Sequence, residues 1–232
     1  MTALHVARCC DHTFVSTGIG PRSVVLDLGV HKGEFATWIT EHFGCWIYGA
    51  EVDPAYYYDF GRHKKIRVFS CAVGGKSGSA VLKRASRKCS TIFAGAFEAE
   101  NSCTVRVVGF EDFLSCAGLG KRNLIDLVKV DIEGAECSMF EEASDSALLR
   151  VAQFSVEFHD FIWPELRERV IRVKSRLRSL GFRSINFSLD DTDVLFLNRT
   201  VLDIGLCADV HLRAIKYANG IKRIAERIAP SA

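Results

Sequence analysis

Acidic residues and a histidine stand where two strand-like apolar runs of the sequence end. Asp131 closes the run Leu124–Asp131, and Glu133 lies just beyond it. His159 closes the run Gln153–His159. In open α/β sheets the carboxyl ends of parallel strands meet at one edge, and ligands bind in the crevice outside them. Because carboxylates and imidazoles take protons from substrates, Asp131, Glu133 and His159 are candidate catalytic residues.

Glu133 and His159 also have a structural explanation. Glu133 and the nearby Glu136 would favour a helix N-terminus through the helix dipole, and His159 would be satisfied at a strand end. The same oxygens and imidazole would also suit Mg²⁺ or Mn²⁺. A general base and a divalent metal site therefore both stay open, and the sequence alone names no metal ligand.

A second candidate site is the turn after the apolar run Ser23–Leu28. The turn contains Gly29 and Gly33, and a helix is expected from Phe35 to Phe43. Glycines admit close approach of a ligand, and a helix N-terminus offers free N–H groups. This pattern is typical of a nucleotide site.

Residues within the turn narrow the choice of nucleotide. The dinucleotide fingerprint G-x-G-x-x-G needs a glycine where the chain has the bulky His31, which disfavours NAD and FAD. A P-loop needs Lys-Ser/Thr after its last glycine, but Glu34 follows here, and its carboxylate would repel phosphate. A cofactor with a ribose, no phosphates and a cationic amino-acid end remains, and S-adenosylmethionine (SAM) has these features.

Two further acids suit such a cofactor. Asp27 lies beside the turn, and Glu51 ends the following strand, where its carboxylate can accept both ribose hydroxyls. The alternative is that Asp27 only caps the turn and that Glu51 faces solvent.

The elements that must position these residues indicate an α/β fold. Strand-like runs alternate with helical segments, which favours a seven-stranded, mostly parallel sheet with helices on both faces. The last two runs are joined by a short polar link, so a hairpin should supply one antiparallel strand. The expected strands are Ser23–Leu28, Cys45–Glu51, Ile66–Ala72, Leu124–Asp131, Gln153–His159, Phe182–Phe187 and Asp193–Asn198.

Three other segments are expected to have distinct roles. An insertion at about 76–108 should contain an antiparallel pair, Gly78–Lys83 with Cys103–Val108, and act as a lid. Pro164 to Leu180 has the spacing of an amphipathic helix whose basic face is solvated. An apolar stripe at about 207–228 predicts an extra C-terminal helix, which packs on its own domain or forms a homodimer; binding to a membrane surface is a third alternative.

Composition excludes several classes of protein. The 232 residues are 48% hydrophobic and 25% charged, which is typical of one folded domain, here 1–232 with its core at about 23–198. A net charge of only +2 does not indicate a nucleic-acid partner. Because no apolar run spans a bilayer and the start lacks a signal-peptide core, we expect a cytoplasmic protein without a membrane span. The nine cysteines are scattered without a C-x-x-C pair, which predicts inert thiols.

Several stretches resemble the FkbM-type family of SAM-dependent methyltransferases. The resemblance runs from about Val24 to Asn198, and its most specific part is the block Lys-Val-Asp-Ile-Glu-Gly-Ala-Glu at 129–136. The family commonly has Ala-Asn where this chain has Val30-His31, so His31 either replaces the contact of that Asn or is a plain turn residue. The matching stretches are Val25–Gly29, Gly33–Phe35, Gly49–Pro54, Cys71–Gly74, Phe110–Leu114, Leu127–Glu136 and Val156–His159.

The resemblance implies a Rossmann-like class I fold and methyl transfer from SAM, with a hydroxyl of a small molecule or glycan as the acceptor. A catalytically silent SAM-binding module and a nicotinamide-dependent oxidoreductase are the alternatives. Asp131 is expected nearest the amino-acid end of the cofactor. The resemblance also implies that Asp27, Gly29 and Gly33 line the methionine side, that Glu51 holds the ribose, and that Cys71 and Ala72 lie near the adenine.

Overall fold

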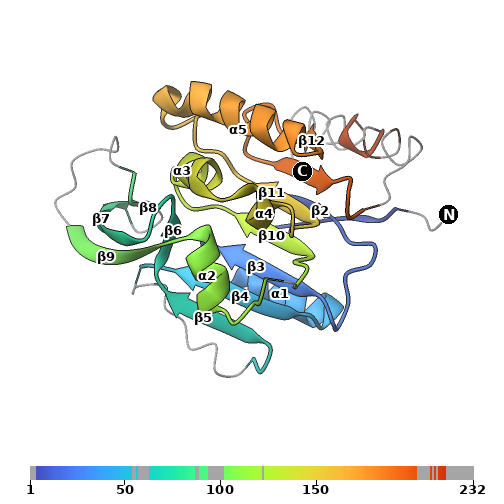
Figure 1. Cartoon of the computed structure of the whole chain (residues 1–232), viewed down its shortest axis with the longest axis horizontal. Coiled ribbons are helices and arrows are strands. Elements are labelled where there is room, and N and C mark those ends of the chain that lie inside the picture. Colours follow the sequence, from blue (N-terminus) through green and yellow to red (C-terminus); the bar gives the residue numbers. More distant parts are fainter. Residues whose placement is uncertain are drawn as a thin grey trace, which may run out of the picture.

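Seven strands form the central sheet of the computed structural model, in the order β12-β13-β11-β10-β3-β4-β5 (Figure 1). The structure describes residues 4–202 except 54–55, 57–62, 87–88, 94–101 and 122, together with 210, 212 and 214–217. The strands are β3 (Val24–Leu28), β4 (Trp46–Glu51), β5 (Ile66–Ser70), β10 (Leu127–Val130), β11 (Gln153–Val156), β12 (Phe182–Asn186) and β13 (Val194–Asn198).

The pairing of these strands brings several carboxyl ends to one edge. β3 lies between β4 and β10 and is parallel to both, and the parallel pairing extends to β5 and β11. β13 runs antiparallel to β11 and β12. Because the chain leaves β3 toward β4 and later returns to pair β10 on its other side, a ligand crevice is expected outside the end of β3.

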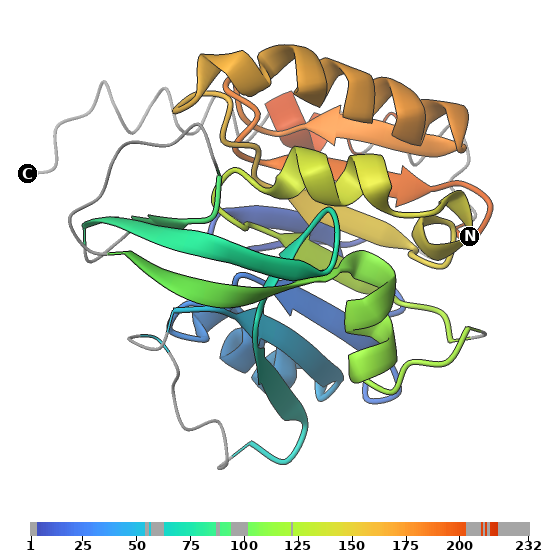
Figure 2. The same ribbon diagram turned by 60° about the vertical axis from the view of Figure 1, so that its left-hand side comes forward.

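A second, four-stranded sheet has the order β6-β9-β7-β8 and comprises β6 (Ala72–Gly74), β7 (Gly78–Ser86), β8 (Cys89–Thr91) and β9 (Ser102–Gly109). Its two long strands, β7 and β9, lie side by side in Figure 2. The predicted antiparallel pair is confirmed, with Gly78 opposite Val107 and Lys83 opposite Ser102. The predicted strand Ile66–Ala72 is wrong at its end, because the chain breaks at Cys71 and Ala72 begins β6 in this other sheet. Lid motion of the insertion stays a prediction.

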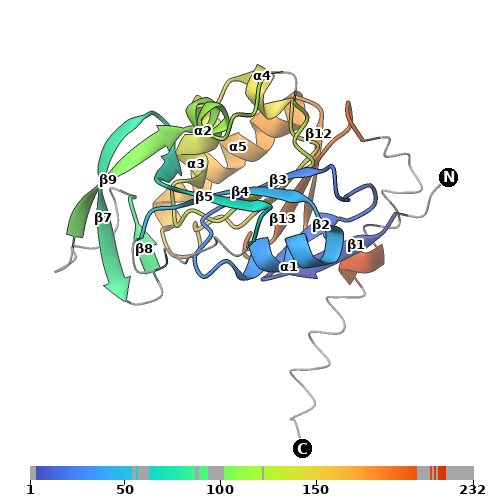
Figure 3. The ribbon, with the colours of Figure 1, turned by 90° about the horizontal axis from the view of Figure 1, so that it is seen from below.

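Different layers cover the two faces of the central sheet (Figure 3). One face carries α1 (Glu34–Phe43) and a hairpin of β1 (Val6–Cys9) and β2 (His12–Val15). Residues alternate between the faces, so Val25 packs with α1 while Leu26 and Leu28 join the larger core on the other side. That other face carries α2 (Phe110–Cys116), α3 (Glu136–Glu142), α4 (Asp145–Leu148) and α5 (Arg167–Ser179).

The N-terminal hairpin has no counterpart among the predicted elements. Its two-residue turn has Cys10 and Asp11 at φ 48° and 64°, the left-handed pair that suits the twist of a tight hairpin. Each strand has only four residues, and the polar His12 and Thr13 are fully buried. The apolar alternation that reveals a strand is therefore missing from the sequence.

In the C-terminal half of the chain the described elements match the predicted ones, except that the predicted strand Gln153–His159 is wrong at its end, because β11 ends at Val156 and His159 lies beyond it. The predicted helix from Pro164 is confirmed as a 3₁₀ turn (Pro164–Leu166) that leads into α5. Most of the predicted helix at 207–228 lies outside the described residues, but 210, 212 and 214–217 are helical, and Leu212 is buried against Ile185 and Leu195. Among the described residues, no helix is long and apolar enough to cross a membrane.

Candidate active site

A pocket lies outside the carboxyl ends of β3, β4 and β10, and residues of the second sheet close one side of it. Asp27, Gly33 and His159 do not belong to its wall. Cys10, Tyr56 and Leu82 line it without having been predicted. The predicted site residues in the wall are Gly29, His31, Glu51, Cys71, Ala72, Asp131 and Glu133.

The turn after β3 is compressed against the end of β10. Gly29 has φ +87°, and a Cβ atom there would lie 1.8 Å from the carbonyl oxygen of Asp131. Only glycine allows this approach. His31 also has a positive φ, 51°, and its backbone N–H donates to Oε2 of Glu51 over 2.7 Å. The turn is thus tied to the ends of both neighbouring strands.

Backbone groups hold the Glu51 carboxylate in one orientation. Its Oε2 accepts from the His31 N–H, and its Oε1 accepts from the N–H groups of Val52 and Asp53 over 2.8 and 2.7 Å. Glu51 is buried, and burial raises its pKa, while these N–H groups oppose the rise. A carboxylate has about four acceptor sites, so these three hydrogen bonds leave capacity on Oε2, and Glu51 is a fixed acceptor in the pocket wall.

Lys129 is a buried cation in the wall of the pocket. Its Nζ lies 3.1 Å from Oδ1 of Asp27 and 3.5 Å from Oδ2 of Asp131, and it donates to the carbonyl of Gly29 over 2.6 Å. Burial alone would lower the pKa of Lys129, but the two carboxylates outweigh burial and raise it. Asp27 is fully buried in this ion cluster, which explains its absence from the pocket wall.

Lys129→Met should lower the free energy of unfolding by about 3–5 kcal/mol, because Asp27 would be left as a buried charge without a partner. Denaturant unfolding measures this loss. Adding Asp27→Asn to Lys129→Met should recover part of it, since the double variant buries no unpaired charge. A double variant that is less stable than Lys129→Met would contradict this explanation of the cluster.

His159 lies behind the pocket wall and joins two acids. Its Nδ1 is 2.9 Å from Oε1 of the buried Glu136, and its Nε2 is 3.3 Å from Oε2 of Glu133. Oε1 of Glu136 also accepts from the backbone N–H groups of Ile132 and Gly134. Burial alone would lower the pKa of His159, but Glu136, Asp131 and Glu133 raise it to about 10. The imidazole is therefore protonated at neutral pH.

Residues 27–184 match the family model described as the methyltransferase FkbM domain. The chain belongs to this family. Membership places it among the SAM-dependent methyltransferases. A comparison with functionally characterised proteins found no match.

Solved structures of other methyltransferases are similar to this FkbM domain chain. One is a methyltransferase from Pyrococcus furiosus, 15% identical with a TM-score of 0.38, where the match covers 78% of each chain. An rRNA methylase from Streptococcus thermophilus is 11% identical with a TM-score of 0.41, over 77% of this chain and 86% of that chain. Human methyltransferase-like protein 13, in complex with SAH, is 14% identical with a TM-score of 0.42, over 82% of each chain.

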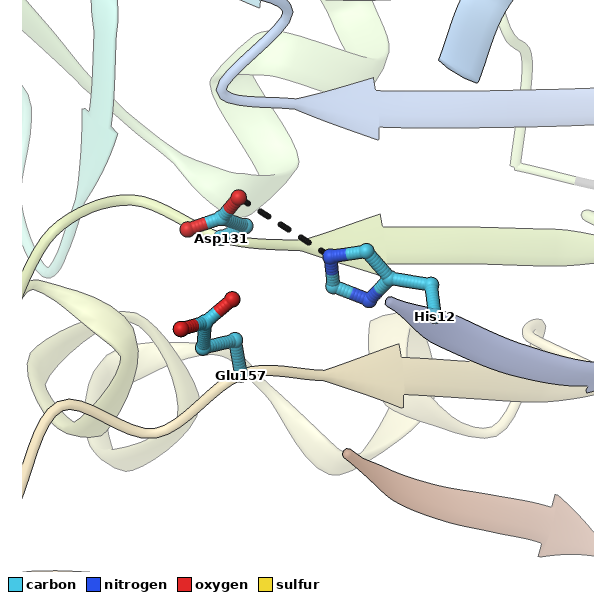
Figure 4. A group of neighbouring side chains, drawn as sticks. All are labelled: His12, Asp131 and Glu157. Carbon is cyan, nitrogen blue, oxygen red and sulfur yellow. Dashed lines mark ion pairs between the residues drawn. The ribbon is translucent and has the colours of Figure 1, made fainter. Parts of the chain in front are cut away.

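In the part of the FkbM domain protein that the structure describes, two groups of side chains lie close enough to share a metal ion. They are Asp131 with Glu133 and His159, and Asp131 with His12 and Glu157. Figure 4 shows the second group beyond the ends of β10 and β11. Both groups use Asp131, whose carboxylate already faces the Lys129 ammonium. Burial and the neighbouring Asp131 raise the pKa of Glu157 to about 7. A divalent metal ion therefore stays one of the alternatives that the sequence left open.

His12, and the role of Lys129 as the partner of Asp27 and Asp131, were not predicted from the sequence. A lysine within the apolar strand Leu127–Val130 is a signal that could have been used, because a buried lysine needs an acid beside it. His12 gives no comparable signal, since nothing local connects it to Asp131.

Proposed function

We propose that the protein transfers a methyl group from SAM to a hydroxyl oxygen of a small molecule or glycan. The observation that carries this proposal is the pocket, whose wall holds the fixed carboxylate of Glu51 and the acids Asp131 and Glu133. Bound SAM would supply an electrophilic methyl group. The residues of the chain must bind this cofactor, orient the acceptor and take up a proton.

The charges of the pocket wall fit SAM better than a phosphate-bearing cofactor. Among the described residues of the wall, four are acids and one is a lysine, Lys129, whose charge is compensated by Asp27 and Asp131. A pyrophosphate would meet net negative charge there, whereas the cationic amino-acid end of SAM would be attracted. This difference supports SAM over a nicotinamide cofactor. The four acids are Glu34, Glu51, Asp131 and Glu133.

Each predicted cofactor residue receives a role in this proposal. Glu51 accepts from the ribose hydroxyls, and Asp131 faces the ammonium of the amino-acid end. Asp27 acts indirectly. It pairs with Lys129, and Lys129 in turn donates to the carbonyl of Gly29. Gly29 and Gly33 shape the turn, His31 ties it to Glu51, and Cys71 and Ala72 form the adenine side.

Glu133 is the proposed proton acceptor. It lines the pocket, whereas His159 does not, and a protonated imidazole cannot accept a proton. His159 instead holds the Glu133 carboxylate from behind at 3.3 Å. In an in-line displacement the acceptor hydroxyl loses its proton as the methyl group is transferred, so a positioned carboxylate is useful.

Glu51→Ala should weaken SAM binding by about 10–100-fold, because a charged hydrogen-bond acceptor is worth about 1.5–3 kcal/mol. Calorimetric titration measures the affinity. Glu168→Ala, on the exposed face of α5, is the control and should bind as the wild type does.

A ribose analogue separates a contact to the ribose from a local disturbance. The wild type should bind S-adenosylhomocysteine more tightly than its 2′-deoxy analogue, and Glu51→Ala should bind the two alike. A variant that still prefers the ribose would remove Glu51 from this role.

Methyl transfer is tested with SAM that carries a labelled methyl group. Hydroxylated sugars and small alcohols are offered beside their amino counterparts. The proposal expects labelled ethers and release of S-adenosylhomocysteine. Label on amines alone would contradict O-methylation, and SAM binding without turnover on any acceptor would favour a catalytically silent module.

A further inference from the structure

The N-terminal hairpin lies outside the family match at 27–184, yet it is anchored beneath the site. Thr13 donates from its backbone N–H and from its hydroxyl to Asp193, over 3.0 and 2.6 Å. Val15 exchanges two hydrogen bonds of 2.8 Å with the side-chain amide of Gln153. These buried contacts fix the position of β2 against the central sheet.

His12 stands at the end of β2 that is nearest the pocket. Its imidazole is fully buried, with Nδ1 3.2 Å from the hydroxyl of Ser155 and the ring edge against Phe35. Nε2 has no hydrogen-bond partner among the described residues, and it faces Oδ2 of Asp131 at 3.8 Å (Figure 4). A buried polar nitrogen without a hydrogen bond is costly, so its position beside a site carboxylate points to a function.

Asp131 is surrounded by groups that compete for its carboxylate. Lys129 and His12 face Oδ2, while His159 faces Oδ1 at 3.8 Å. On the remaining side the carboxyl of Glu157 approaches it, as Figure 4 shows. Without His12, Asp131 would lose one of its favourable partners and keep the unfavourable neighbour Glu157.

We infer that His12 is a positioning residue of the SAM site: the hairpin brings its Nε2–H to Asp131 and keeps the Asp131 carboxylate turned toward the pocket. The inference requires the Ser155 hydroxyl to donate to Nδ1, which leaves the ring hydrogen on Nε2. This inference rests on the proposed function, since it assumes that Asp131 faces the ammonium of SAM. The hairpin then contributes to the active site from outside residues 27–184, which match the family model.

Two substitutions test the two ring nitrogens of His12 separately. Asparagine keeps a polar group near the position of Nδ1, beside Ser155, and removes the group that faces Asp131. Glutamine places its amide near the position of Nε2. His12→Asn should weaken SAM binding by about 10-fold and raise the KM for SAM more than it lowers kcat, whereas His12→Gln should bind SAM within about 2-fold of the wild type.

Val173→Ala is the control for a loss of stability alone. Val173 of α5 is buried in the main core, so its truncation should lower the melting temperature while the folded protein keeps its SAM affinity. If His12 were merely structural, SAM affinity would follow the melting temperature across all three variants, and asparagine and glutamine would behave alike. Either result would overturn the inference.

Two further measurements separate other outcomes. Failure of the wild type to bind SAM would overturn the proposed function and this inference together, whereas wild-type affinity in folded His12→Asn would overturn the inference alone. Metal analysis of the purified protein covers the remaining case. One equivalent of a divalent metal in the wild type that His12→Asn lacks would make His12 a metal ligand and contradict the inference.

Discussion

Replacing Gly29 with alanine is expected to abolish SAM binding and methyl transfer. The new Cβ would lie 1.8 Å from the carbonyl oxygen of Asp131, which is backbone and cannot rotate away. The turn after β3 and the end of β10 must then separate, which also breaks the contact between Lys129 and the Gly29 carbonyl. We expect SAM affinity to fall by more than about 100-fold, since such a shift disturbs several contacts of the site at once.

Gly18→Ala is the matched control for this substitution. Gly18 has φ +88°, almost the same as Gly29, but apart from its chain neighbours no atom of the described residues lies within 4 Å of the position of its Cβ. It should therefore show only the cost of a left-handed alanine, about 1 kcal/mol, and bind SAM normally. Calorimetric titration and denaturant unfolding of both variants decide the matter. Equal behaviour would mean that the close approach at Asp131 is unimportant.

Glu133→Gln is expected to lower kcat by about 10²–10⁴, the usual loss when a general base is removed. SAM affinity should change little, because the amide keeps the size of the side chain and the cofactor contacts are assigned to other residues. Steady-state kinetics with saturating acceptor, beside a direct SAM titration, separate the two effects.

Glu168→Gln is the control for Glu133→Gln. It makes the same chemical change on the exposed face of α5 and should leave kcat unchanged. If Glu133→Gln kept the wild-type kcat, proton transfer to Glu133 would not contribute to the rate. If kcat were kept and SAM affinity fell instead, Glu133 would belong to the cofactor contacts.

The parts of the fold that could be predicted are those with a local signal. The helix at Pro164–Leu180 shows apolar residues at helical spacing, and the apolar strands of the central sheet are bounded by polar links. The break at Cys71 could not be predicted, because Ile66–Ala72 reads as one continuous run. Only tertiary pairing sends Ala72 to the second sheet.

The candidate site likewise contains residues with a local signal in the sequence and residues without one. Glu51 and Gly29 could be found because each ends a strand or begins a turn of recognisable composition. His12 could not, because it acts through Asp131, more than a hundred positions along the chain, from a short polar strand. Asp27 was expected in the pocket wall, but its carboxylate is fully buried against Lys129. This ion pair joins residues that are far apart in the chain, so no local sign of it is present in the sequence.

A crystal structure of the protein with S-adenosylhomocysteine tests the central claim most directly. Our account predicts the adenosine in the pocket outside β3, β4 and β10, both ribose hydroxyls donating to Glu51, and the sulfur facing Glu133. Binding of S-adenosylhomocysteine elsewhere, or in this pocket with Glu51 turned away from the ribose, would contradict it.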